Sequence, residues 1–152
     1  MKWFILMSVL PVIAIAEPLN ELNEALSIYG AVAEVDESEG AIRLKLQRRI
    51  SFDHDSREPK RESSASISAL SVFSDFFDGQ VLFNLQGHTD RSGSTEYNLI
   101  LGMDRAKRIG GLLRHSESIP TSEGEDYPRS NVPAENRRVE VSANFIKGDD
   151  NQ

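Results

Sequence analysis

Hydrophobic and polar positions along the 152-residue chain follow two different periods, which predict a series of strands and helices. On either side of the polar turn 36–40, apolar residues alternate or run together in 31–35 and 41–50, as expected for a β-hairpin. The apolar positions in 66–79 instead recur at intervals of three and four residues. This spacing predicts a core helix that ends at Gly79.

The second half of the chain continues the series. Residues 80–86 predict a strand, and a helix capped near residue 94 extends to about His115. The stretch 118–135 is rich in turn-forming residues, and regular alternation returns in 138–145. The order β-β-α-β-α-β predicts an α+β fold, a β-α-β-α-β sandwich with two helices packed on a mixed β-sheet.

The first residues have the composition of a secretory signal peptide. One basic residue, Lys2, precedes an apolar run over 3–15, and small residues occupy Ala14 and Ala16, which predicts cleavage after Ala16. The run is shorter than the roughly 20 residues that a membrane-spanning helix needs. We therefore expect a signal peptide over 1–16 and no transmembrane span in the mature chain; an uncleaved anchor is the alternative.

The rest of the chain divides into three parts. Apolar residues at helical spacing in 17–30 predict a short helix or a linker, 31–147 form a single domain, and 148–152 form a disordered tail. The chain contains no cysteine. Attachment of a lipid through an N-terminal cysteine and stabilisation by disulfides are therefore both excluded.

Charge and residue spacing exclude several classes of function. Because the net charge is -7, nucleic acid is not expected as a partner. The three histidines are scattered and no cysteine accompanies them, so neither a metal site nor a cofactor is predicted. Ser92, His88 and Asp90 are neighbours in sequence, but the chain has no nucleophile elbow of the G-x-S-x-G type. We therefore expect the domain not to be an enzyme.

Two charged residues stand in surroundings that are otherwise apolar or rich in glycine. Asp90 lies in the segment 87–93, directly after an apolar strand, and Arg105 falls midway between Leu101 and Ile109 on one helix face. A charge within an apolar face must be paired or must line a polar cleft. A carboxylate beside a guanidinium suits a zwitterionic amino-acid ligand, whereas the structural alternative is that the two residues pair with one another.

Three sequence blocks resemble the OmpA-like C-terminal domain that peptidoglycan-associated lipoproteins and MotB-type proteins share. The family patterns G-H-T-D-x-x-G, N-x-x-L-S-x-x-R-A-x-x-V and N-R-R-V-E are matched in order by 87–93, 98–109 and 136–140. Gly102 departs from the pattern, because the family usually has serine there. The resemblance covers about 31–147, and it implies the same fold class as the periodicity.

The resemblance also implies a ligand and a set of residues that bind it. Asp90 would face the ammonium and Arg105 the carboxylate at the free end of meso-diaminopimelate in peptidoglycan stem peptides. The other matched positions of the family site are Phe52, Asp53, Asn98, Leu101 and Arg137.

The sequence therefore predicts an exported cell-envelope protein of a Gram-negative bacterium that binds peptidoglycan without covalent attachment. Its expected location is the periplasm, in association with the outer membrane or the cell wall. One alternative is an interaction module of an envelope assembly, with a stator, secretion-system or outer-membrane partner and with wall binding secondary. A weaker alternative is a hydrolase of the wall.

Overall fold

A computed structural model describes residues 12–38 and 41–145. Residues 1–11 of the predicted signal peptide and the predicted tail 148–152 lie outside the described residues. In chain order the elements are α1 (Val12–Ser27), β1 (Ala31–Asp36), β2 (Ala41–Leu46), β3 (Ile50–Ser51), the short 3-10 helix η1 (Arg61–Ser63), α2 (Ser64–Phe76), β4 (Val81–His88), α3 (Thr95–Leu112), β5 (Glu117–Gly124), α4 (Pro133–Asn136) and β6 (Arg138–Phe145). In this part of the chain no helix combines the length and apolar character needed to cross a bilayer.

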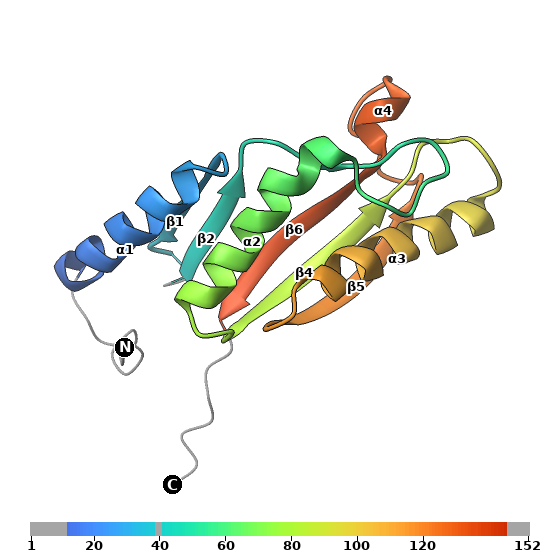
Figure 1. Ribbon diagram of the computed structural model, residues 1–152. Coiled ribbons are helices and arrows are strands. Elements are labelled where there is room, and N and C mark those ends of the chain that lie inside the picture. Colours follow the sequence, from blue (N-terminus) through green and yellow to red (C-terminus); the bar gives the residue numbers. More distant parts are fainter. Residues whose placement is uncertain (1–11, 39–40, 146–152) are drawn as a thin grey trace, which may run out of the picture.

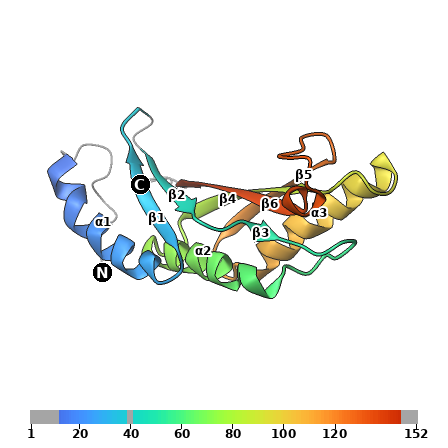
Figure 2. The same ribbon diagram turned by 90° about the horizontal axis from the view of Figure 1, so that it is seen from above.

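The strands form a two-stranded and a four-stranded sheet. The hairpin β1-β2 is antiparallel, and the larger sheet has the order β3-β6-β4-β5. In it β4 and β5 are parallel while β6 is antiparallel to both of its neighbours. Helices α1, α2 and α3 lie on the same side of the strands (Figures 1 and 2). The predicted α+β fold with helices packed on a mixed sheet is confirmed.

The hairpin strand is shorter than the sequence predicts. Strand β2 ends at Leu46, and Ile50 belongs to β3, which pairs with β6 in the other sheet. Residues 47–49 are three exposed polar side chains in succession, so no apolar alternation holds them against the core. The chain bends here, and Ser66 of α2 donates a hydrogen bond of 2.8 Å to the carbonyl of Arg48.

Strand β5 is absent from the sequence prediction, which assigns 118–135 to turns. The strand contains Pro120 and is otherwise rich in Ser, Thr and Glu, a composition typical of loops. It can form because it is the edge strand of the sheet. A proline is tolerated there, since its missing N–H group need not pair with a further strand. Its pairing with β4 is parallel, with α3 as the crossover between the two strands.

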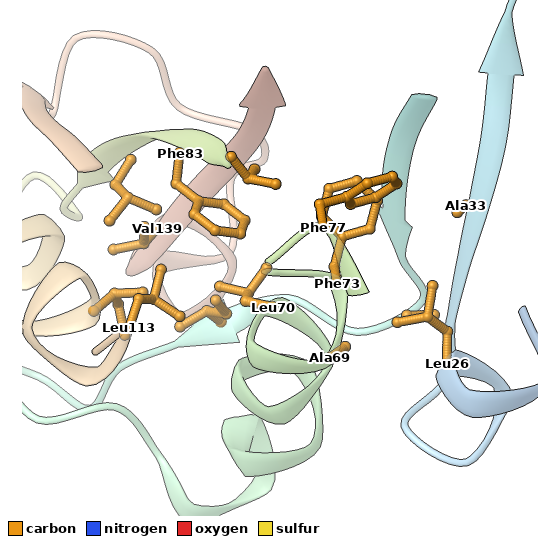
Figure 3. Close-up of a cluster of buried hydrophobic side chains, with 14 of the residues drawn as sticks. Leu26, Ala33, Ala69, Leu70, Phe73, Phe77, Phe83, Leu113 and Val139 are labelled. Carbon is orange, nitrogen blue, oxygen red and sulfur yellow. The ribbon is translucent and has the colours of Figure 1, made fainter. Parts of the chain in front are cut away.

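The hydrophobic core lies between α2 and the strands. Leu70 and Phe73 of α2, and Phe77 directly after it, belong to one buried cluster with Phe83 of β4 and Val139 of β6 (Figure 3). The rings of Phe73 and Phe77 are in edge-to-face contact, with centroids 5.0 Å apart. Burial of each large apolar side chain contributes about 1.5–3 kcal/mol. This packing holds the sheet rigid beneath the loops at its end.

Helix α1 covers the hairpin. It begins at Val12 and therefore includes the end of the predicted signal segment. Leu22 and Leu26 are fully buried, and the side-chain amide of Asn23 exchanges two hydrogen bonds with the backbone of Ala33, of 2.7 and 3.0 Å. The residues after the predicted cleavage point are thus packed against β1.

Strand β4 and helix α3 approach unusually closely at two glycines. A Cβ on Gly87 would lie 1.7 Å from the carbonyl oxygen of Gly102. A Cβ on Gly102 would lie 2.3 Å from Oγ of Ser122 on β5. In this chain the Ser122 hydroxyl occupies space beside α3, which accounts for glycine where the family usually has serine.

This contact predicts opposite effects for two alanine substitutions. Gly87→Ala should lower the free energy of unfolding by about 2–3 kcal/mol, because the backbones of β4 and α3 must separate. Gly111→Ala has nothing within 4 Å of the new Cβ, so it should raise that free energy by up to about 1 kcal/mol through helix propensity. Urea denaturation of both variants checks the prediction, and equal stabilities would contradict the close contact.

Candidate functional site

A cleft of about 230 Å³ opens at the end of the sheet where β4 stops. The loop after β3 forms one wall, and the loop between β4 and α3, with the first turns of α3, forms the other. Ser94 begins α3 by accepting a hydrogen bond of 3.1 Å from the amide of Tyr97. We call this the Asp90–Arg105 cleft, and its lining residues are His54, Asp55, Thr89, Asp90, Ser92, Gly93, Tyr97, Asn98, Leu101 and Arg105.

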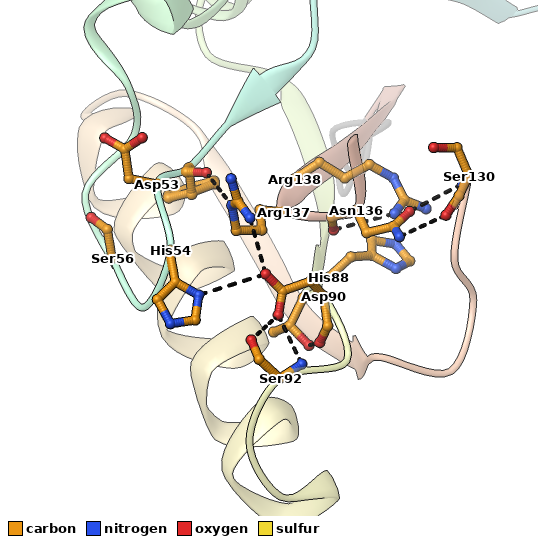
Figure 4. Close-up of polar contacts among 12 residues, drawn as sticks. Asp53, His54, Ser56, His88, Asp90, Ser92, Ser130, Asn136, Arg137 and Arg138 are labelled. Carbon is orange, nitrogen blue, oxygen red and sulfur yellow. Dashed lines mark hydrogen bonds and ion pairs between the residues drawn. The ribbon is translucent and has the colours of Figure 1, made fainter. Parts of the chain in front are cut away.

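The Asp90 carboxylate is held at the rim of the cleft by its own loop and by Arg137, which lies between α4 and β6. Its Oδ1 accepts hydrogen bonds from the amide of Ser92, at 3.0 Å, and from the Ser92 hydroxyl. Its Oδ2 accepts a hydrogen bond of 3.0 Å from Nη1 of Arg137, and Nδ1 of His54 lies 3.7 Å away (Figure 4). The Asp90 carboxylate therefore connects the loop after β4 with the residue that precedes β6.

The Arg105 guanidinium is fully buried at the floor of the cleft. It donates to three backbone carbonyls, those of Ser56 at 2.8 Å, His88 at 3.0 Å and Asp53 at 3.1 Å. Its Cζ lies 5.0 Å from the centroid of the Phe52 ring, a cation–π contact. Arg105 thus ties α3 to β4 and to the loop after β3.

The structural alternative, direct pairing of Asp90 with Arg105, is not what the structure contains. Asp90 pairs with Arg137 instead. Among the described residues Arg105 has no ion-pair partner, and the hydrogen bonds given above go to neutral carbonyls. Two guanidinium groups, those of Arg105 and Arg137, therefore lie near the Asp90 carboxylate, and the Asp55 carboxylate also lines the cleft.

Burial and neighbouring charges shift the pKa values of both groups. Burial raises the pKa of Asp90, but the hydrogen bonds from Ser92 and the contact with Arg137 outweigh it and lower the pKa to about 2. Burial lowers the pKa of Arg105 to about 10, against the attraction of Asp90. Both groups are therefore ionised at neutral pH, as recognition of a zwitterion requires.

The other sequence-predicted residues occupy different places around the cleft. Asn98 and Leu101 line it from α3, and the Asn98 amide donates a hydrogen bond of 3.2 Å to Glu125. Phe52 lies beneath Arg105 rather than in the lining. Asp53 contributes its backbone carbonyl, while its side chain is exposed and lies 3.6 Å from Nζ of Lys60. Arg137 acts through Asp90.

Sequence reasoning did not select His54, Asp55 or Tyr97 as site residues. The Tyr97 hydroxyl donates a hydrogen bond to the Asp55 carboxylate, which joins the two walls of the cleft. Asp55 has a backbone φ of 55°, a conformation that aspartate adopts more readily than most residues. A polar loop and the exposed start of a helix carry no periodic pattern, so the sequence offered no indication of this contact.

His88 of the G-H-T-D block is buried behind the cleft, on β4. Its Nε2 lies 3.1 Å from Oε1 of Gln86 and 3.8 Å from Glu140. Its Nδ1 is buried without a hydrogen-bond partner. Burial, together with the nearby charge of Arg138, lowers the pKa of His88 to about 4.

This pKa predicts how stability depends on pH. Between pH 6.5 and about 4 the unfolded state binds a proton at His88 and the folded state does not, so stability falls as the pH falls. The loss attributable to His88 is at most roughly 3 kcal/mol. Urea unfolding of His88→Gln should lose this part of the pH dependence, whereas the exposed control His115→Gln should retain it. Identical profiles for His88→Gln and the unaltered protein would contradict the prediction.

The part of the chain that the structure describes contains no group of three or more His, Cys, Asp or Glu side chains that could hold a metal ion.

Comparison with solved structures gives several relatives of the fold. The peptidoglycan-associated lipoprotein from Burkholderia pseudomallei has a TM-score of 0.58 and 26% identity, over 65% of this chain and 92% of that one. The OmpA-like domain of FopA1 from Francisella tularensis has a TM-score of 0.59 and 14% identity, over 77% and 81%. A putative MotB-like protein from Desulfovibrio vulgaris has a TM-score of 0.57 and 20% identity, over 87% and 94%.

No protein-family model matches the sequence, and no curated protein matches it either. The assignment therefore depends on the fold, on the three sequence blocks in their order, and on the structural relatives. Together these show that the chain has the fold of OmpA-like domains, whose sequence patterns its three blocks resemble.

Proposed function

We propose that this protein binds peptidoglycan non-covalently, by holding the free end of meso-diaminopimelate in the Asp90–Arg105 cleft. The ligand end carries one ammonium and one carboxylate. In the proposed complex its ammonium lies beside Asp90 and its carboxylate beside Arg105. Similarity to the Burkholderia peptidoglycan-associated lipoprotein, over 92% of that chain, supports the same class of ligand.

The observation that carries the proposal is the state of Arg105. A fully buried guanidinium with no carboxylate partner among the described residues is costly to maintain. Arginine has five N–H donors, and three of them go to backbone carbonyls, so the remaining two are available to a carboxylate. Its planar geometry suits a carboxylate held by two hydrogen bonds.

Asp90 has the complementary capacity. A carboxylate offers about four acceptor positions, and Ser92 and Arg137 use three of them. The remaining position can accept a hydrogen bond from an ammonium group. Because Arg137 already neutralises Asp90 in part, the contribution of Arg105 to binding should be at least as large as that of Asp90.

Export and location belong to the same proposal. Segment 1–16 would direct export and be cleaved after Ala16, leaving the mature protein in the periplasm at the wall or the outer membrane. The domain would act by binding alone, without catalysis. An envelope protein as the main partner is the alternative.

The test is co-sedimentation of the purified protein with two kinds of peptidoglycan sacculi. Sacculi with meso-diaminopimelate at the third peptide position should carry the protein into the pellet, and free meso-diaminopimelate should release it. Sacculi with lysine at that position have the ammonium but no carboxylate for Arg105, so they should bind it poorly. Soluble muropeptides in the supernatant would favour the hydrolase, and equal or absent binding to both sacculi would favour the protein-partner alternative.

A further inference from the structure

A second hollow, about 480 Å³ in volume, lies beside the Asp90–Arg105 cleft and has a different charge. Its walls come from the bend between β2 and β3, from the start of β6 and from α4. Five cationic side chains line it, and we call it the basic groove: Arg48, Arg49, Lys60, Arg137 and Arg138.

The charge of the basic groove is opposite to that of the whole protein. The chain has 24 acidic and 17 basic residues, yet the groove has only two carboxylates, those of Glu62 and Glu135, against its five cations. Glu135 is 3.9 Å from Arg49, a distant pairing. Arg48 is exposed and has no ion-pair partner among the described residues. Lys60, Arg137 and Arg138 pair with carboxylates outside the lining, those of Asp53, Asp90 and Glu140. The positive charge available to a ligand is therefore that of Arg48, together with Arg49, whose pairing is distant.

Two contacts connect the basic groove to the cleft. Arg137 lines the groove, and its Nη1 is 3.0 Å from Asp90 of the cleft. Lys60 lines the groove and is 3.6 Å from Asp53, whose carbonyl accepts a hydrogen bond from Arg105. Figure 4 shows Arg137 between Asp53 and Asp90. A peptide that enters the cleft at one end can therefore continue across Arg137.

We propose that the basic groove binds a second carboxylate of the same peptide whose diaminopimelate end occupies the cleft, with Arg48 and Arg49 as its main contacts. The inference rests on the proposed function. A stem peptide has free carboxylates besides that of the diaminopimelate end, on D-glutamate and on the terminal D-alanine. Their attraction to exposed arginines is weak for each pair and is screened by salt, so the groove adds affinity and orientation to the binding in the cleft.

The experiment compares two soluble probes by calorimetric titration of the full chain. One probe is free meso-diaminopimelate, and the other is the tetrapeptide L-Ala-γ-D-Glu-meso-diaminopimelyl-D-Ala. The double variant Arg48→Gln with Arg49→Gln should bind the tetrapeptide about fivefold more weakly than the unaltered protein and should bind free diaminopimelate equally well. The matched control Lys107→Gln with Arg114→Gln removes the same charge from exposed positions on and after α3, and it should leave both affinities unchanged.

Each outcome decides a different point. Unchanged affinity of the double variant for the tetrapeptide would overturn the basic groove, while binding of free diaminopimelate by the unaltered protein would still support the cleft. An equal loss for both probes would also overturn the groove, because the effect would then act through the cleft or the fold. If the unaltered protein bound neither probe, both the proposed function and this inference would fail. In about 0.5 M salt the difference in tetrapeptide affinity between the unaltered protein and the double variant should become smaller, since the Debye length is then only a few ångströms.

Discussion

Arg105→Ala is expected to lower the free energy of unfolding by about 3–5 kcal/mol and to abolish binding to sacculi. The substitution removes hydrogen bonds to the carbonyls of Ser56, His88 and Asp53, of which the contact with His88 is buried and the other two are partly buried, and it empties the space that the fully buried side chain fills. It also removes the cation from the Phe52 ring. Its burial therefore gives Arg105 a role in stabilising the fold in addition to its proposed role in binding the ligand. Urea denaturation and sacculus co-sedimentation measure the two effects.

Arg108→Ala is the matched control, because it replaces another arginine of the same helix, α3. Arg108 is exposed and pairs with Glu58 at 2.8 Å, a surface ion pair that contributes at most about 1 kcal/mol. This variant should fold and bind like the unaltered protein. Arg105→Lys keeps a cation but not the planar donor geometry, so it should lose most binding even where it remains folded. Normal stability of Arg105→Ala would contradict the structural role described here.

Asp90→Asn is expected to weaken binding of diaminopimelate by about 2–5 kcal/mol while the protein remains folded. The amide preserves the shape of the side chain but offers an ammonium no negative charge. The exposed control Asp75→Asn on α2 should bind normally. Equal affinity of Asp90→Asn and the unaltered protein would mean that the carboxylate only holds Arg137 in place.

Asp90 also predicts a distinct effect of acid. Its pKa falls from 3.8 to about 2 on folding, so it stabilises the folded state above pH 3.8 by roughly 2 kcal/mol. That stabilisation is lost as the pH falls toward 2, and Asp90→Asn should lack this part of the acid transition. The window is lower than that of His88, so the two contributions can be separated in the same titration.

The regular elements of this fold are predictable where one face of an element is apolar. The core helix that contains Leu70 and Phe73, and the strand β6 with its alternating residues, follow from periodicity because burial of one face is what stabilises them. Strand β5 does not, since its Ser, Thr and Pro120 form an edge strand only because β4 is there to pair with it. The break after Leu46 likewise depends on contacts with α2 that are distant in sequence.

The site was predictable to the extent that its residues lie in recognisable blocks. Asp90, Asn98, Leu101 and Arg105 line one cleft, and the spacing of the helix residues places them on one face. The partner of Asp90 was not predictable, because Arg137 lies just before β6, 47 residues further along the chain. Three-dimensional proximity, rather than local pattern, selects Arg137 over Arg105 for the ion pair.

The most direct test of the central claim is an amide chemical-shift titration of the protein with free meso-diaminopimelate. We expect saturable shifts at the amides of Ser92, Gly93 and Asn98, which surround the cleft, and their loss in Asp90→Asn. The central claim would be contradicted if these amides did not shift at saturating ligand, or if they shifted equally in the unaltered protein and in Asp90→Asn.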